Sequence, residues 1–163
     1  MNIILKPFTE TEYHQFFREY VADPLMEPMP FVYNEEAVSR SYQYNYGGRD
    51  HYAHYGIFAD KTPIGCFQLK RIDEEKKTCE FGLMLQHDGV KNQGVGTEAV
   101  RQGMIIARDV FGMKTILADT TSGNIRMIRV FQKLNFELIE TVPHAFKLLD
   151  GRPDDRLVYC KEL

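Results

Sequence analysis

A glycine-containing turn between an apolar run and an amphipathic segment limits the folds open to this chain more than any other feature. The turn, Lys91-Asn92-Gln93-Gly94-Val95-Gly96, follows the apolar run 81–85 and precedes apolar residues at helical spacing. Glycine lets the backbone adopt positive φ and approach a ligand closely, and the free N–H groups of a first helical turn attract anions. These residues predict a strand, a phosphate-binding turn from Asn92 to Thr97, and a helix.

Two common phosphate-binding motifs differ from this turn. A Walker A loop requires Gly-Lys-Ser/Thr, whereas Gly96 is followed by Thr97 and Glu98. A dinucleotide fingerprint ends on a third glycine, where this chain has Ala99. Because alanine is tolerated at that position, the turn alone leaves the dinucleotide class open.

Composition, net charge and cysteine spacing limit the class of protein to which this chain can belong. A chain of 163 residues, 44% hydrophobic and 26% charged, predicts a single domain over residues 1–163. The net charge of −3 argues against a general binder of nucleic acid or membrane surfaces, and no run is long enough to span a membrane. Cys66, Cys79 and Cys160 form no C-x-x-C pair, so we expect no metal site and a location in the reducing cytoplasm.

Hydrophobic periodicity predicts a mixed α/β (α+β) fold. We expect strands at residues 2–8, 51–59, 63–72, 79–85, 115–120, 136–142 and 156–162. We expect helices from Thr9 to Asp23, Glu35 to Tyr46, Gly96 to Phe111 and Asn124 to Leu134, and irregular structure from Pro143 to Asp155. This order predicts a mixed central sheet of about seven strands flanked by about four helices.

With this order in view, the chain resembles the GNAT N-acetyltransferase superfamily over nearly its whole length. The turn resembles the acyl-CoA loop of that family, Arg/Gln-x-x-Gly-x-Gly/Ala, with Lys91 at the first position. Residues 80–82 resemble motif A and residues 124–136 resemble motif B, while the opening 5–8 and the ending 150–159 are similar to the RimJ/RimL branch. The resemblance implies the GNAT fold, acetyl-CoA as acyl donor and an amine as acceptor.

The resemblance also implies roles for individual residues. The turn from Lys91 to Thr97 would hold the pyrophosphate, and backbone N–H groups of Leu83, Met84 and Leu85 would polarise the thioester carbonyl. Asn124 resembles the asparagine that contacts the pantetheine arm, although a helix cap explains it as well. Glu80 is the candidate base for the acceptor amine, with a paired strand carboxylate as an equal alternative.

Two residues beside the expected thioester depart from the family. Phe131 stands where many relatives carry a tyrosine that protonates the leaving thiolate, and Met127 where RimJ/RimL relatives often carry a serine. Neither side chain can donate a proton to sulfur. Three hypotheses stay open: an acetyltransferase acting on a protein N-terminal α-amine, one acting on a small-molecule amine (polyamine, amino acid or antibiotic), and a CoA-binding module without activity. A second copy of the chain, forming a homodimer, is an open partner.

Two further groups are candidates for the acceptor side. Tyrosines concentrated between residues 33 and 55 are explained by packing on the sheet or by a wall of the acceptor cleft. Asp150, Asp154 and Asp155 would favour a cationic amine if they bordered that cleft, and otherwise belong to a solvated loop.

Overall fold

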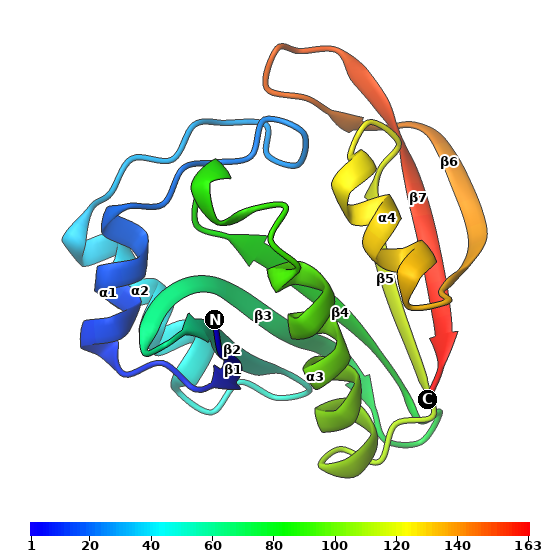
Figure 1. Cartoon of the computed structure of the whole chain (residues 1–163), viewed down its shortest axis with the longest axis horizontal. Coiled ribbons are helices and arrows are strands. Elements are labelled where there is room, and N and C mark those ends of the chain that lie inside the picture. Colours follow the sequence, from blue (N-terminus) through cyan, green and yellow to red (C-terminus); the bar gives the residue numbers. More distant parts are fainter.

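The computed structural model describes all 163 residues and confirms the mixed α/β fold (Figure 1). Seven strands form one sheet in the order β1-β2-β3-β4-β5-β7-β6. The strands are β1 (Ile3–Lys6), β2 (Ala53–Ala59), β3 (Thr62–Asp73), β4 (Thr78–Leu85), β5 (Thr115–Thr121), β6 (Glu137–Lys147) and β7 (Pro153–Glu162). The helices are α1 (Glu10–Arg18), α2 (Glu35–Tyr46), α3 (Val95–Asp109) and α4 (Ile125–Lys133), with a short 3-10 turn η1 (Asp88–Val90).

Strands β4 and β5 are the parallel neighbours in this sheet, and they separate part-way along their length. They pair only from Thr78 to Glu80 and from Thr115 to Leu117, although β4 continues to Leu85. Helix α3 provides the crossover that a parallel pair needs. The sheet therefore opens into a V, toward the starts of α3 and α4 (Figure 1).

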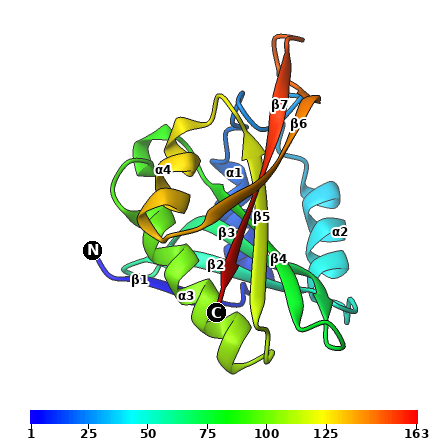
Figure 2. The same cartoon turned by 90° about the vertical axis from the view of Figure 1, so that its right-hand side faces the viewer.

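Each face of the sheet has its own hydrophobic cluster. The larger cluster lies under α3 and α4, and the smaller one lies under α1 and α2. Figure 2 shows α3 and α4 on one side of the sheet and α2 on the other. Phe67 and Cys66, neighbours in β3, belong to different clusters because successive strand side chains point to opposite faces. No helix is long and apolar enough to cross a membrane.

Local capping signals place the starts of the first two helices. Thr9 and Glu12 form the expected capping box of α1, and the Phe8 ring lies edge-on to Tyr13 at 5.4 Å between centroids. The Asn34 side chain accepts a hydrogen bond from the N–H of Ala37 at the start of α2. These starts confirm the sequence-based prediction.

The predicted end of α1 at Asp23 is wrong, because the helix ends at Arg18. Buried Gln86, just beyond β4, is the reason: its side chain donates to the carbonyl of Phe16 at 2.9 Å. Its own carbonyl accepts the N–H of Val21 at 2.8 Å. The chain therefore leaves the helix to bond to the end of β4.

The predicted irregular segment from Pro143 to Asp155 is also wrong, since β6 and β7 form a long antiparallel hairpin. Pro143 lies on the edge strand β6, in a register shift between Val142 and Phe146. A proline is tolerated at such a bulge because no ladder hydrogen bond is lost. The N–H of His144 donates to Asp155 Oδ1 at 3.0 Å, which ties the bulge to β7.

The contact between α3 and β3 generates a stability prediction. A Cβ added to Gly103 would lie 2.1 Å from Cζ of the fully buried Phe67. Gly103→Ala should therefore lower the free energy of unfolding by about 1–3 kcal/mol, measured by urea denaturation. Gly82→Ala is the matched control, because its added Cβ would lie 3.7 Å from the Gln68 side chain, an ordinary contact. Equal effects of the two substitutions would contradict the close approach.

Candidate functional site

The glycine turn leaves three backbone donors free at the start of α3. Gly94 is the N-cap, with φ of 78°, and no side chain caps the helix. The N–H groups of Val95, Gly96 and Thr97 have no acceptor in the chain. Free N–H groups at the positive end of a 15-residue helix are suited to an anion.

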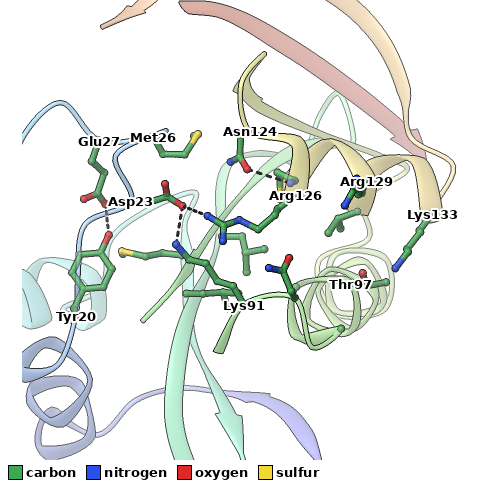
Figure 3. A pocket seen from close by; sticks show the side chains of 18 residues that line it. Tyr20, Asp23, Met26, Glu27, Lys91, Thr97, Asn124, Arg126, Arg129 and Lys133 are labelled. Atoms are coloured by element: carbon green, nitrogen blue, oxygen red, sulfur yellow. Dashed lines mark hydrogen bonds and ion pairs between the residues drawn. The ribbon is translucent and has the colours of Figure 1, made fainter. Parts of the chain in front are cut away.

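Gly94, Gly96 and Thr97 border a pocket of about 410 Å³ beside the end of β4 (Figure 3). Four segments line it. The connection between α1 and α2 contributes Tyr20, Asp23, Met26 and Glu27, and the end of β4 contributes Leu83, Met84 and Leu85. The turn and α3 contribute Lys91, Asn92, Gly94, Gly96 and Thr97, and α4 with its cap contributes Asn124, Arg126, Met127, Arg129, Val130 and Lys133.

Ten of the candidate residues from the sequence lie together in this pocket: Leu83, Met84, Leu85, Lys91, Asn92, Gly94, Gly96, Thr97, Asn124 and Met127. Asn124 also caps α4, accepting the N–H of Met127 at 3.3 Å, so both interpretations of this residue fit. Two turn residues keep their side chains out of the pocket. Gln93 donates to the Gly89 carbonyl at 2.7 Å, and the Val95 side chain is buried in the core.

Glu80 is not among the residues that line the pocket. It is the last β4 residue that pairs with β5, and its carboxylate forms an ion pair with Arg71. Its neighbours Cys79 and Phe81 are buried under α3, so the Glu80 side chain points to the opposite face of the sheet. This placement supports the alternative interpretation, a paired strand carboxylate.

Phe131 is a core residue here. Its ring is fully buried and stacks on Tyr159 at 4.2 Å between centroids, with Phe81 and Phe136 at its other sides. The side chain at this position therefore packs the sheet under α4, whereas Met127 faces the pocket.

The remaining acceptor-side candidates have structural partners. The hydroxyl of Tyr46 accepts the N–H of Phe8 at 3.0 Å, which supports the packing interpretation of the tyrosines. The three aspartates lie outside the pocket, bonded within the chain: Asp150 to Arg152, Asp154 to Ser122 and Gly123, and Asp155 to His144.

The pocket is lined by four basic side chains, Lys91, Arg126, Arg129 and Lys133, and two carboxylates, Asp23 and Glu27. Asp23 Oδ2 lies 2.9 Å from Lys91 Nζ and 3.9 Å from the Arg126 guanidinium. Lys91 also lies 3.0 Å from the exposed Asp88, and its hydrogen bond lowers the pKa of that carboxyl. The ammonium of Lys91 thus joins the glycine turn to the α1–α2 connection.

Sequence reasoning missed Tyr20 and Glu27 as site residues. The Tyr20 ring is buried, and its hydroxyl donates a hydrogen bond to Glu27 Oε1. Burial, and then the Glu27 carboxylate, raise the pKa of Tyr20. Periodicity places Tyr20 on the apolar face of a helix, and no local motif distinguishes Glu27 from other loop carboxylates.

Comparison with known proteins decides the family. Residues 2–137 match the model of the acetyltransferase (GNAT) domain. The chain belongs to the GNAT family. It is therefore an acetyltransferase, with acetyl-CoA as the acyl donor.

This GNAT acetyltransferase is similar to several characterised proteins. It is 26% identical over 154 residues to human alpha/beta-tubulin-N-acetyltransferase 9, across 86% of this chain and 74% of the relative. RimL, a ribosomal L7/L12 α-N-protein acetyltransferase in complex with coenzyme A, superposes with a TM-score of 0.87 at 18% identity, covering 100% of this chain and 95% of RimL. A chimera of spermidine N-acetyltransferase SpeG from Vibrio cholerae and hSSAT superposes with a TM-score of 0.85 at 13% identity, covering 99% and 96%.

The free donors at α3 generate a binding prediction for the acetyltransferase. Acetyl-CoA should stabilise the folded chain by about 2.7 kcal/mol at a hundredfold excess over its Kd, measured as a rise in Tm. Gly94→Asp should abolish this rise, because it places a carboxylate where we expect the pyrophosphate. Gly151→Asp is the matched control, since both glycines have positive φ and open space around an added Cβ. The same response of the two variants would contradict the assignment.

The ion pairs of Asp23 generate a second prediction. Asp23→Asn removes a negative charge beside Lys91 and Arg126, so acetyl-CoA should bind roughly two- to fivefold more tightly, measured by calorimetry at low salt. The gain should shrink in 1 M salt, where such charges are screened. Asp150→Asn, an exposed aspartate outside the pocket, should leave the affinity unchanged. Weaker binding by Asp23→Asn would contradict this prediction. It would show that the ion pair of Asp23 with Lys91 aids binding by fixing the α1–α2 connection more than its negative charge opposes binding.

Proposed function

We propose that this acetyltransferase transfers the acetyl group of acetyl-CoA to the α-amine of a protein N-terminus. The observation that supports it is the charge of the pocket, which is lined by four basic side chains and two carboxylates. Asp23 is already paired with Lys91 and approached by Arg126, whereas Glu27 has no cationic partner. The pocket therefore has one carboxylate left for a cationic acceptor.

A single positive charge matches an N-terminal amine better than a polyamine. A polyamine brings several charges into a pocket whose lining is already basic, and like charges repel. An α-amine has a pKa of about 7.7–8.0, against about 10.4 for lysine, so far less free energy is needed to deprotonate it near neutral pH.

The relatives lend the proposal further support. The tubulin and ribosomal-protein acetyltransferases named above act on proteins, by their names. SpeG has the same fold and acts on spermidine, so the fold alone does not decide between the acceptors.

The same pocket provides the other requirements of acyl transfer. Beyond Glu80, strand β4 has no partner on the side of β5, so backbone groups between Leu83 and Leu85 are free to polarise the thioester carbonyl. Neither Phe131 nor Met127 can protonate the sulfur. We infer that the thiolate leaves and takes its proton from water, since a thiol with a pKa of about 8.5 is a moderate leaving group.

The acceptor is tested with three amines at equal concentration: a lysine-free peptide with a free α-amine, the same peptide with a blocked N-terminus and one lysine, and spermidine. We expect kcat/KM, from thiol release and product mass, to be highest for the free α-amine by roughly tenfold or more near pH 7, because more of it is neutral. The blocked peptide without lysine controls for hydrolysis of acetyl-CoA. A preference for spermidine or for the lysine peptide would refute the proposal.

A further inference from the structure

Glu27 and Tyr20 form a hydrogen-bonded pair on the side of the pocket away from Thr97 and Lys133 (Figure 3). We propose that Glu27 is the base that takes a proton from the acceptor amine, and that Tyr20 is the residue that positions it. This inference rests on the proposed acetyl transfer to an amine. It assigns the base to Glu27, because the β4 candidate Glu80 does not line the pocket.

The Tyr20 ring of this pair is held by packing, whereas one carboxylate oxygen of Glu27 has no partner in the chain. The Tyr20 ring is 7% exposed, stacks on Phe16 at 5.6 Å and meets Phe31 edge-on at 5.2 Å between centroids. Its hydroxyl therefore has a fixed position from which it holds Glu27 Oε1. Glu27 Oε2 receives no hydrogen bond from the chain, which leaves it free for an amine.

The backbone that carries Glu27 is also held in place. The Glu27 N–H donates to the Asp23 carbonyl at 2.9 Å, which closes a turn. Thr121 Oγ1, at the end of β5, donates to the Leu25 carbonyl at 2.9 Å. A carboxylate on a segment fixed in this way keeps its geometry when the substrate arrives, which is what proton transfer needs.

Glu27 is the pocket carboxylate without a cationic partner. The charged or titratable side chains that line the pocket around it are Tyr20, Asp23, Lys91, Arg126, Arg129 and Lys133. Asp23 is occupied by Lys91, and Glu80 is paired with Arg71 outside the pocket. No other carboxylate lines the pocket.

The acceptor amine arrives as an ammonium ion and must lose two protons. Glu27 takes one proton from the ammonium and passes it to bulk water, and the neutral nitrogen attacks the carbonyl carbon. The new C–N bond forms, the C–S bond breaks, and the sulfur keeps the bonding electrons. The second proton lost by nitrogen reaches the sulfur through water, so the products are the N-acetyl amine, free CoA thiol and one proton.

Glu27→Gln keeps the size of the side chain and its acceptor for the Tyr20 hydroxyl, but it cannot act as a base. We expect kcat/KM for the amine to fall roughly 10²- to 10³-fold at pH 7. The deficit should shrink toward pH 9 as the amine loses its proton to solvent, while the Kd for acetyl-CoA stays unchanged in calorimetry. Glu27→Asp should recover part of the activity. Glu19→Gln, an exposed glutamate on the same segment, is the matched control.

Tyr20→Phe keeps the buried ring and removes only the hydroxyl. It should lower kcat by roughly tenfold, with the KM for acetyl-CoA unchanged, because Glu27 loses its anchor but remains a base. If Glu27→Gln lowers Tm or weakens acetyl-CoA binding, then Glu27→Asp and Tyr20→Phe decide instead.

Three outcomes overturn the assignment: activity of Glu27→Gln within threefold of wild type, a loss that does not change with pH, or a larger loss for Glu80→Gln. All variants are compared on whichever amine the wild-type chain acetylates fastest. Failure of the α-amine proposal therefore leaves this test of Glu27 intact.

Discussion

The parting of β4 from β5 is the constraint on which the rest of the structure depends. Each strand keeps its outer partner to the end, β4 with β3 and β5 with β7. The facing edges beyond Glu80 and Leu117 lose their partners, and backbone polar groups left unpaired near a core require water or a ligand. The pocket, the start of α3 and the cap of α4 all lie at this opening.

The connection between α1 and α2 bridges the two arms of the opening. On one side, Val21 is bonded to Gln86 at the end of β4, and on the other, Thr121 of β5 holds Leu25. Asp23 adds an ionic link to Lys91 in the glycine turn. A segment without regular structure is thus fixed at three points. It brings its acidic side chains to a pocket in which the glycine turn and α4 carry basic ones.

Local signals in the sequence predicted most of the fold, because Thr9, Asn34, Gly94 and Asn124 each mark a helix start by their own chemistry. The errors arose where distant contacts decide. Gln86, which ends α1, lies 70 residues beyond the carbonyl that it binds. Pro143 locally predicts the end of a strand, but it is tolerated because β6 is an edge strand with a bulge there. The residues of the candidate site also fall into those that local motifs predict and those that distant contacts place. The turn and the α4 cap were recognisable, whereas the place of Glu27 depends on a loop folding across the gap.

The separate origins of the pocket walls bear on how such a protein can change its selectivity. Residues from β4, α3 and α4 surround the expected donor, and Tyr20, Met26 and Glu27 come from one irregular connection. With the acceptor placed as we propose, substitutions in that connection would alter which amine is accepted and leave the groups around the donor as they are. Asp23 is the exception, because its ion pair with Lys91 links this connection to the glycine turn. We expect acceptor preference to drift through this connection over evolutionary time, with Asp23 among its slowest positions.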